Sequence, residues 1–323
     1  MDPLAFFATS RLVIVAGKGG VGKTTVTAAL AVAAAKSGLR VLVVEVEGKS
    51  GLGRLFGVDS LGYDEASVLE PERGSSAGTV LARAITPTDA LLEYLVDHGM
   101  RRLSNRLVRG GALDVVATAA PGIEDILVLG KVKQLERAGT VDLILLDAPA
   151  AGHAITFLES ARGLLDAVTV GPINTQARDV LEMLTDPERS SVVLVTLPEE
   201  TPVNELVDTA YSLEDRVGLS LGPVIVNGLY PERPGMDVDP AAAAEEAAVA
   251  LMPGEADALR AAAAFRSARV ALQTEQLARL SDRLPLPQIH LPFLFTTDLS
   301  HDDVHVLGDA ALAGIAGLGP LPS

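Results

Sequence analysis

The chain has 323 residues, 48% apolar but only 3% aromatic, which is enough for one large α/β domain with an aliphatic core. Its formal net charge of −16 disfavours non-specific binding to nucleic acid and to anionic lipid, and the absence of cysteine excludes disulfides and thiolate metal sites, so no zinc is expected. No apolar run reaches the roughly 18–20 residues that span a bilayer, so no stable membrane insertion is expected. The N-terminal segment lacks the basic region of a secretory signal, which predicts a cytoplasmic protein.

The first predicted elements are a strand, a glycine-rich turn and a helix. The apolar run 12–16 predicts a buried strand, and the alanine-rich run 24–36 predicts a helix that ends before Gly38. Between them the chain matches the phosphate-loop pattern G-x-x-x-x-G-K-[ST]. In such a turn, backbone N–H groups and the helix N-terminus attract phosphate. The predicted nucleotide-binding residues are Gly17, Lys18, Gly19, Gly20, Val21, Gly22, Lys23, Thr24 and Thr25.

Three side chains of this loop have predicted roles. Lys23 is expected to reach the β- and γ-phosphates, and Thr24 to hold Mg²⁺ through its hydroxyl. Lys18 follows the first glycine on the outer rim of the turn, from which it does not easily bend back to its own γ-phosphate. We expect it to act catalytically across a subunit interface, as an arginine finger does in trans. The alternative is a solvated surface lysine, which is common on exposed loops.

This double-lysine loop resembles the deviant phosphate loop of the MinD/ParA, nitrogenase iron protein and arsenite-pump ATPases, which are nucleotide-dependent dimers. In the arsenite-pump and tail-anchored-protein-targeting ATPases, the next strand ends in an Asp that helps to activate water. Aligned from the predicted strand 40–46, Glu47 takes that place, which implies that it orients the attacking water. The alternative is that Glu47 caps the loop or pairs with Lys49. Glu45 is the weaker candidate for orienting the water.

Residues 86–136 carry apolar residues at helical spacing and are predicted to form a helical subdomain. The segment PGIEDILVLGKV at 121–132 resembles the entry to the subdomain in which targeting ATPases hold a client's transmembrane segment. That groove is rich in methionine, whereas Met100 is the only methionine of this span. A hydrophobic protein client and an ordinary leucine-rich core are both compatible with the pattern.

A second motif closes the predicted strand 141–147. Asp147 ends this strand as a Walker-B aspartate does, and we expect it to orient Mg²⁺. The family's switch II has the sequence D-T-A-P-T-G-H, and Asp147, Gly152 and His153 keep the same offsets. The resemblance implies that the N–H of Gly152 donates a hydrogen bond to the γ-phosphate.

The nucleotide base is expected at the ends of two later strands. Asn227 ends a predicted strand 222–227, where relatives use an asparagine to donate to and accept from the adenine edge. The alternative is a turn asparagine before Gly228. Pro292 and Phe293 follow the last predicted strand, where relatives place a loop over the adenine.

The rest of the chain predicts further strands and helices and no zinc clasp. Strands are predicted at 167–170, 191–197 and 288–291, and helices from 203, at 240–252, at 255–284 and at 299–315. We favour a packed helical hairpin for 240–284 over a coiled-coil partner site. Residues 171–190 are about one helix long, and the family's C-x-x-C zinc pair is absent.

These patterns predict a single doubly wound α/β P-loop domain over 1–323, with a mainly parallel sheet and an inserted helical subdomain. The resemblance to the arsenite-pump and tail-anchored-protein-targeting ATPases implies a Mg²⁺-dependent ATPase that binds ATP and ADP, acts as a nucleotide-gated dimer and couples hydrolysis to a protein partner or membrane-protein client. Glu47 in place of Asp, the missing zinc pair and the reduced client groove leave a second interpretation. This is a regulatory subunit of low turnover in a heterodimer with a paralogous ATPase. A positioning role of the MinD/ParA type is disfavoured by the acidic charge.

Overall fold

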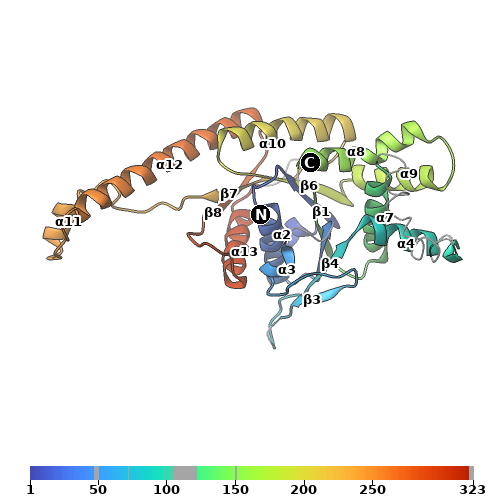
Figure 1. Ribbon diagram of the computed structural model, residues 1–323, viewed down its shortest axis with the longest axis horizontal. Helices are drawn as coiled ribbons and strands as arrows, with labels where there is room; N and C mark the ends of the chain where they lie inside the picture. The colour runs from blue at the N-terminus through green and yellow to red at the C-terminus, as the bar shows by residue number, and fades with distance from the viewer. Residues whose placement is uncertain are drawn as a thin grey trace.

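The computed structural model describes residues 1–46, 51–71, 73–97, 99–102, 104, 122–149 and 151–319, with the backbone alone at 151–153. These residues form an eight-stranded sheet in the order β3-β4-β2-β5-β1-β6-β7-β8 (Figure 1). Strand β3 runs antiparallel to β4, and the other neighbours are parallel. The strands are β1 (Leu12–Gly17), β2 (Val41–Val46), β3 (Ala66–Leu69), β4 (Val80–Ile85), β5 (Leu143–Asp147), β6 (Ser190–Thr196), β7 (Val224–Leu229) and β8 (Gln288–Pro292). The predicted α/β fold with a mainly parallel sheet is confirmed.

Helices cover both faces of this sheet (Figure 1). One face is covered by α1 (Pro3–Phe7), α2 (Lys23–Lys36), α3 (Leu52–Leu55) and α13 (His301–Ala316). The other face is covered by α4 (Pro87–Asp97), α7 (Ile123–Ala138), α8 (Ala151–Ala167), α9 (Pro172–Thr185), α10 (Glu200–Ser212) and the π-helical turn η1 (Leu213–Val217). Helices α11 (Pro240–Glu246) and α12 (Glu255–Arg283) extend away from the body.

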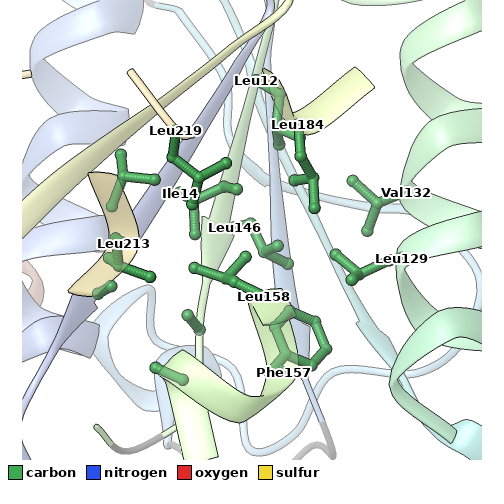
Figure 2. Close-up of a cluster of buried hydrophobic side chains, with 14 of the residues drawn as sticks. Leu12, Ile14, Leu129, Val132, Leu146, Phe157, Leu158, Leu184, Leu213 and Leu219 are labelled. Carbon is green, nitrogen blue, oxygen red and sulfur yellow. The ribbon is translucent and has the colours of Figure 1, made fainter. Parts of the chain in front are cut away.

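The central strands are apolar throughout because both of their faces are buried. All six residues of β1 are buried, and its side chains alternate between the two cores. Leu12 and Ile14 pack with α7 and α8, as Figure 2 shows, whereas Val13 and Val15 pack under α2. The sheet thus holds the carboxyl ends of β1 and β5 side by side, since Val15 is in register with Asp147.

Helix α2 packs closely against α13 because both present small residues. Ten of its 14 residues are buried, most of them alanine or valine. A Cβ added at Gly308 of α13 would lie 2.9 Å from Cγ1 of Val32, so the two helices meet where glycine removes a side chain. The helix that begins at the phosphate loop is therefore held by tight packing along its length.

One predicted strand, at 167–170, is wrong. Helix α8 continues to Ala167, where the Val168 N–H still donates to the carbonyl of Leu164. Val170 is 80% exposed, and the neighbouring position in the sheet is taken by β6, which pairs directly with β1. The short apolar run is a helix-to-helix connection, closed by a 2.6 Å hydrogen bond from Asn174 Nδ2 to the Val168 carbonyl.

Two further expectations about the helices are corrected. Helix α11 stops at Glu246 rather than 252, because Ala248 takes a left-handed conformation (φ 52°) and the Val249 N–H bonds back to the Ala244 carbonyl. The prediction that residues 240–284 form a packed helical hairpin is also wrong over most of its length, because most of α12 is not buried. No residue of α12 before Gln273 is buried.

The predicted helical subdomain lies only partly within the described residues. Helices α4 and α7 are present in the span 86–136, with Gly122 as the N-cap of α7. Residues 105–121 of that span lie outside the described residues, as does Glu47.

Candidate functional site

The motif Gly17–Thr25 covers the last residue of β1, the loop that follows it and the first turn of α2. Close contacts shape this loop. A Cβ at Gly17 would lie 2.4 Å from the Val195 carbonyl oxygen of β6. Gly22 has φ 88°, and a Cβ there would lie 2.3 Å from Nδ2 of Asn227. Both positions require glycine, and the loop ends at the first residue of α2, Lys23. Its N–H groups are thus placed at a helix N-terminus, as an anion site requires.

The side chains of Lys23 and Thr24 have different partners, one inside the loop and one at the end of β5. The Lys23 ammonium donates to the Lys18 carbonyl oxygen over 3.1 Å and so spans the turn. Burial lowers the pKa of Lys23, an effect that the nearby Asp147 carboxylate opposes. The Thr24 hydroxyl donates to Oδ2 of Asp147 over 2.8 Å. The loop and the end of β5 are therefore brought together, as the two sequence motifs predict.

The donors around Asp147 fit a magnesium ion. A threonine hydroxyl and a carboxylate are hard oxygen ligands, and Mg²⁺ commonly takes one or two such protein ligands besides phosphate oxygens and water. Asp147 is 4% exposed and lies in register with Glu45 of β2, which is 3% exposed. The buried carboxylate of Glu45 is thus one strand from Asp147, whereas Glu47 is outside the described residues.

Lys18 contacts its own chain in this structure. Its ammonium forms an ion pair with Oε1 of Glu205 on α10, and both side chains are 42% exposed. The predicted trans lysine is therefore accessible to solvent, and a carboxylate of the same chain holds it at the edge of the loop.

Asn227 contacts the phosphate loop, and its role at the base stays a prediction. Its Nδ2 donates to the Val21 carbonyl oxygen over 3.0 Å. Asn227 does not end its strand: β7 continues through Gly228 (φ 76°) to Leu229, with a register shift against β8. The Phe293 N–H, just after Pro292 at the end of β8, donates to the Leu229 carbonyl over 2.7 Å. The structure thus places Asn227 on β7 and Phe293 directly after the adjacent strand β8.

An aromatic cluster extends this site and was not predicted. The rings of Tyr230, Phe293 and Phe295 contact one another, with centroids 4.9–5.2 Å apart. The guanidinium of Arg266 lies 5.3 Å from the centroid of Tyr230 and 5.2 Å from that of Phe295, while Arg269 lies 5.8 Å from Tyr230. Phe295 is 59% exposed, so the cluster presents an aromatic face to solvent.

Gly152 of the second motif lies in the first turn of α8 rather than in a loop. Its backbone N–H is one of those that have no acceptor within the helix. Helix α8 begins four residues after Asp147, so Gly152 is near its N-terminus, and the contact of its N–H with the γ-phosphate stays a prediction.

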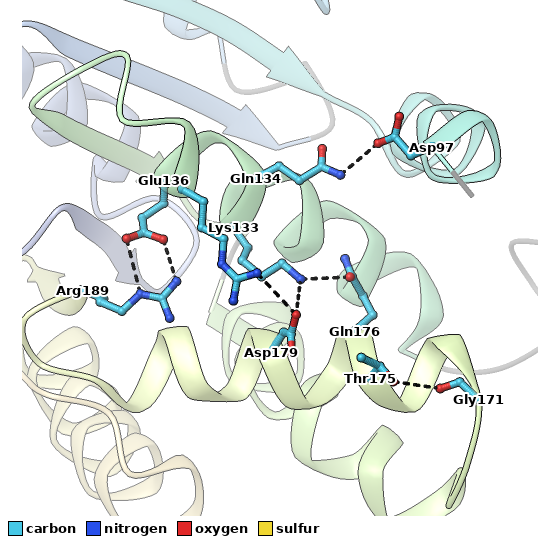
Figure 3. Close-up of polar contacts among 10 residues, drawn as sticks. Asp97, Lys133, Gln134, Glu136, Gly171, Thr175, Gln176, Asp179 and Arg189 are labelled. Carbon is cyan, nitrogen blue, oxygen red and sulfur yellow. Dashed lines mark hydrogen bonds and ion pairs between the residues drawn. The ribbon is translucent and has the colours of Figure 1, made fainter. Parts of the chain in front are cut away.

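A separate apolar cavity of about 330 Å³ lies among α4, α7, α8 and α9. Its walls include Leu95, Met100, Ile126 and Ile173. The surrounding helices are joined by polar contacts, which Figure 3 shows. The Lys133 ammonium contacts Gln176 and Asp179, each at 3.0 Å, Gln134 bonds to Asp97, and Arg189 pairs with Glu136 at 2.6 Å. The cavity therefore has a framework of fixed helices.

Two features are absent from the described part of the chain. Among those residues, no helix is both long and apolar enough to cross a membrane. The same residues contain no cluster of three or more His, Cys, Asp or Glu side chains that would hold a metal ion by themselves.

The sheet order, the loop and the Thr24–Asp147 contact define the class of P-loop nucleotide hydrolases. Within that class the chain belongs to the anion-transporting ATPase family, whose model matches residues 10–170 and 167–247.

Curated relatives agree with this assignment. The ATPase BagA of Mycobacterium tuberculosis is 38% identical over 228 residues, which are 68% of this chain and 66% of BagA. A Halobacterium salinarum relative is 28% identical over 96% of this chain, and an arsenical pump-driving ATPase of Escherichia coli is 29% identical over 67%. The matches span 66%, 45% and 34% of those three relatives, so the chain covers less than two thirds of their length.

Proposed function

We propose that this chain is a Mg²⁺-dependent ATPase that acts as a nucleotide-gated dimer. The observation that carries the proposal is the contact between Thr24 and Asp147, which joins the phosphate loop to the end of β5. Lys23 and the loop N–H groups bind the phosphates, and Thr24 and Asp147 would hold Mg²⁺, which neutralises phosphate charge when bound. Glu47 orients the attacking water in this proposal, because the family's aspartate occupies the corresponding strand end.

The dimer part of the proposal is supported by the position of Lys18. The Lys18–Glu205 ion pair is half exposed, so it stabilises the chain only weakly and can exchange for another anion. A triphosphate carries far more negative charge than one carboxylate. In the dimer, Lys18 leaves Glu205 and reaches the phosphates bound to the partner.

ATP turnover against protein concentration tests this proposal. Specific activity should rise with concentration, fall strongly in Lys18→Ala, and stay near wild type in Lys36→Ala. Lys36 is a matched control because it also forms an ion pair, with Asp309, but at the far end of α2. Activity independent of concentration and unaffected by Lys18→Ala would contradict the dimer. ATP binding without turnover at any concentration would instead favour the regulatory subunit, paired with a paralogous ATPase.

The apolar cavity supports the coupling of this ATPase to a hydrophobic protein client. One of its lining residues, Ile173 in the first turn of α9, is 36% exposed. An apolar peptide of transmembrane composition should bind wild type, and Ile173→Asp should weaken that binding. Val170→Asp is the control, because Val170 is exposed on the connection just before α9 but is not among the residues that line the cavity. Equal binding by both variants would show that the cavity is not the client site.

A further inference from the structure

Gln273 of α12 is a buried polar residue that the proposed chemistry does not use. It is 3% exposed, although it stands where α12 leaves the body and the residues before it in the helix are not buried. A glutamine amide carries both donors and an acceptor, and burial without partners would cost free energy. Both ends of this amide are bonded to the backbone.

The two partners of Gln273 flank the irregular end of β7. Its Nε2 donates to the Gly228 carbonyl oxygen over 3.1 Å, and its Oε1 accepts from the Tyr230 N–H over 2.9 Å. The register between β7 and β8 shifts here, and Gly228 has a positive φ, so regular pairing of the strands is interrupted. The side chain of Gln273 therefore satisfies one backbone group inside the bulge, at Gly228, and one just after the end of β7, at Tyr230.

This bulge includes the residue proposed to contact the base, because the register shifts between Val226 and Leu229. Asn227 immediately precedes Gly228 and bonds to Val21 of the phosphate loop. Tyr230 immediately follows Leu229, the last residue of β7, and packs on Phe293. A shift of the Gly228–Tyr230 backbone would move Asn227 and the aromatic face together, because they are parts of one short segment.

We propose that Gln273 is a positioning residue that sets the base selectivity of the nucleotide site. This inference rests on the proposed function, because it takes Asn227 to hydrogen-bond the adenine edge of bound ATP. By bridging Gly228 and Tyr230, Gln273 holds the bulge in the one conformation that presents the Asn227 amide and the Tyr230–Phe293 face to the base. The two printed hydrogen bonds of Gln273 go to Gly228 and Tyr230 and neither goes to the phosphate loop, so its loss should weaken the base contact more than phosphate binding.

The test compares the dissociation constants of ATP, GTP and inorganic tripolyphosphate for the whole chain with Mg²⁺. Gln273→Leu removes both bridging bonds at similar volume and should weaken ATP binding by about tenfold, the size expected for buried hydrogen bonds. The preference for ATP over GTP should fall by a similar factor, while tripolyphosphate binding stays within about twofold. Gln273→Glu, which retains the acceptor for the Tyr230 N–H, should lie between Gln273→Leu and wild type.

Gln276→Leu is the matched control. Gln276 lies one turn further along α12 and is also 3% exposed, but its Oε1 has no hydrogen-bond partner among the described residues. Gln276→Leu should leave all three dissociation constants near wild type. Thermal unfolding of each variant reports whether it is folded. Asn227→Ala should lower the ATP preference as Gln273→Leu does, and the double variant should lower it no further, because both changes act on one contact.

The outcomes separate this inference from the proposed function. If Asn227→Ala lowers the ATP preference but Gln273→Leu matches Gln276→Leu, the positioning role is wrong and the base site stands. If Gln273→Leu weakens ATP and tripolyphosphate equally, its role is structural and the inference is overturned. If Asn227→Ala leaves the preference unchanged, the base site itself is wrong, and the role of Gln273 falls with it.

Discussion

Helices α2 and α12 are both rich in alanine, yet one is buried and the other projects into solvent. Ten of the 14 residues of α2 are buried, against three of the 29 residues of α12. Between Thr25 and Ala35, α2 has no charged residue, whereas α12 carries Arg260, Arg266 and Arg269 among its alanines. Alanine favours a helix in either setting. The residues between the alanines determine whether that helix packs on the sheet.

The two helices are connected through α10. Glu205 of α10 pairs with Lys18 at the phosphate loop. One face of the same segment binds α12, since Arg269 pairs with Glu199 and Arg283 donates to Asn204. The nucleotide loop and α12 are therefore attached to neighbouring residues of one short helix, Glu205 and Asn204. The part of α12 before Gln273, which projects from the body, is called the arm below.

The largest expected difference between the two helices concerns nucleotide binding. Lys23→Ala should abolish measurable ATP binding, a loss of about 100-fold or more, because it removes the half-buried ammonium that we propose contacts the phosphates. Arg260→Ala on the arm should leave ATP affinity unchanged. Isothermal titration of both variants checks this, and unchanged ATP affinity in Lys23→Ala would show that the phosphates bind elsewhere.

The same alanine-to-leucine substitution should lower the free energy of unfolding more in α2 than in α12. Ala33 of α2 is fully buried, so Ala33→Leu should lower the free energy of unfolding by about 1–3 kcal/mol through overpacking. Ala262→Leu on the exposed arm should change it by no more than about 0.5 kcal/mol. Denaturant unfolding measures both. A similar loss in the two variants would mean that the arm is buried in solution.

Release of Lys18 should give a few-fold effect on turnover. Glu205→Gln removes the anion that holds Lys18, so the protein concentration for half-maximal specific activity should fall roughly threefold, as suits a half-exposed ion pair. Glu200→Gln, which removes the partner of Arg279 on α12, is the control. A rise in the half-maximal concentration would indicate that Glu205 supports the dimer rather than opposing it.

The smallest expected effect is on the pH dependence of stability. Burial, then the charges of His301 and Lys36, lower the pKa of His305 on α13, which packs on α2. The neutral imidazole is favoured in the fold, so stability is full above the unfolded pKa of about 6.5 and decreases as pH falls below it. The melting temperature should drop by no more than about 2 °C from this group, and His305→Gln should reduce the slope. Helices α11 and α12 contain no histidine.

The elements that sequence predicts best are those with a complete local pattern. The phosphate loop, the apolar run of β1 and the aspartate at the end of β5 each lie within a few consecutive residues, and the sheet brings them together. The run at 167–170 has the apolar character of a strand but no sheet position, which only the strand order reveals.

Contacts between distant segments were missed for a different reason. Gln273 and Tyr230 lie 43 positions apart, and Lys18 and Glu205 lie 187 apart. No periodicity links such residues, and glutamine or arginine within an alanine-rich helix is typical of an ordinary solvated face. Their partners become known only when α12 and α10 are placed against the sheet.

The projecting arm also affects how the molecule moves through water. At about 1.5 Å per residue, the 29 residues of α12 span about 43 Å, roughly twice the radius of gyration of about 20 Å for a compact chain of this length. Friction depends on shape as well as mass, so a single chain should elute from a sizing column ahead of a globular protein of 33.5 kDa. Sedimentation equilibrium and light scattering report mass, and these are the methods that will distinguish a dimer from one elongated chain.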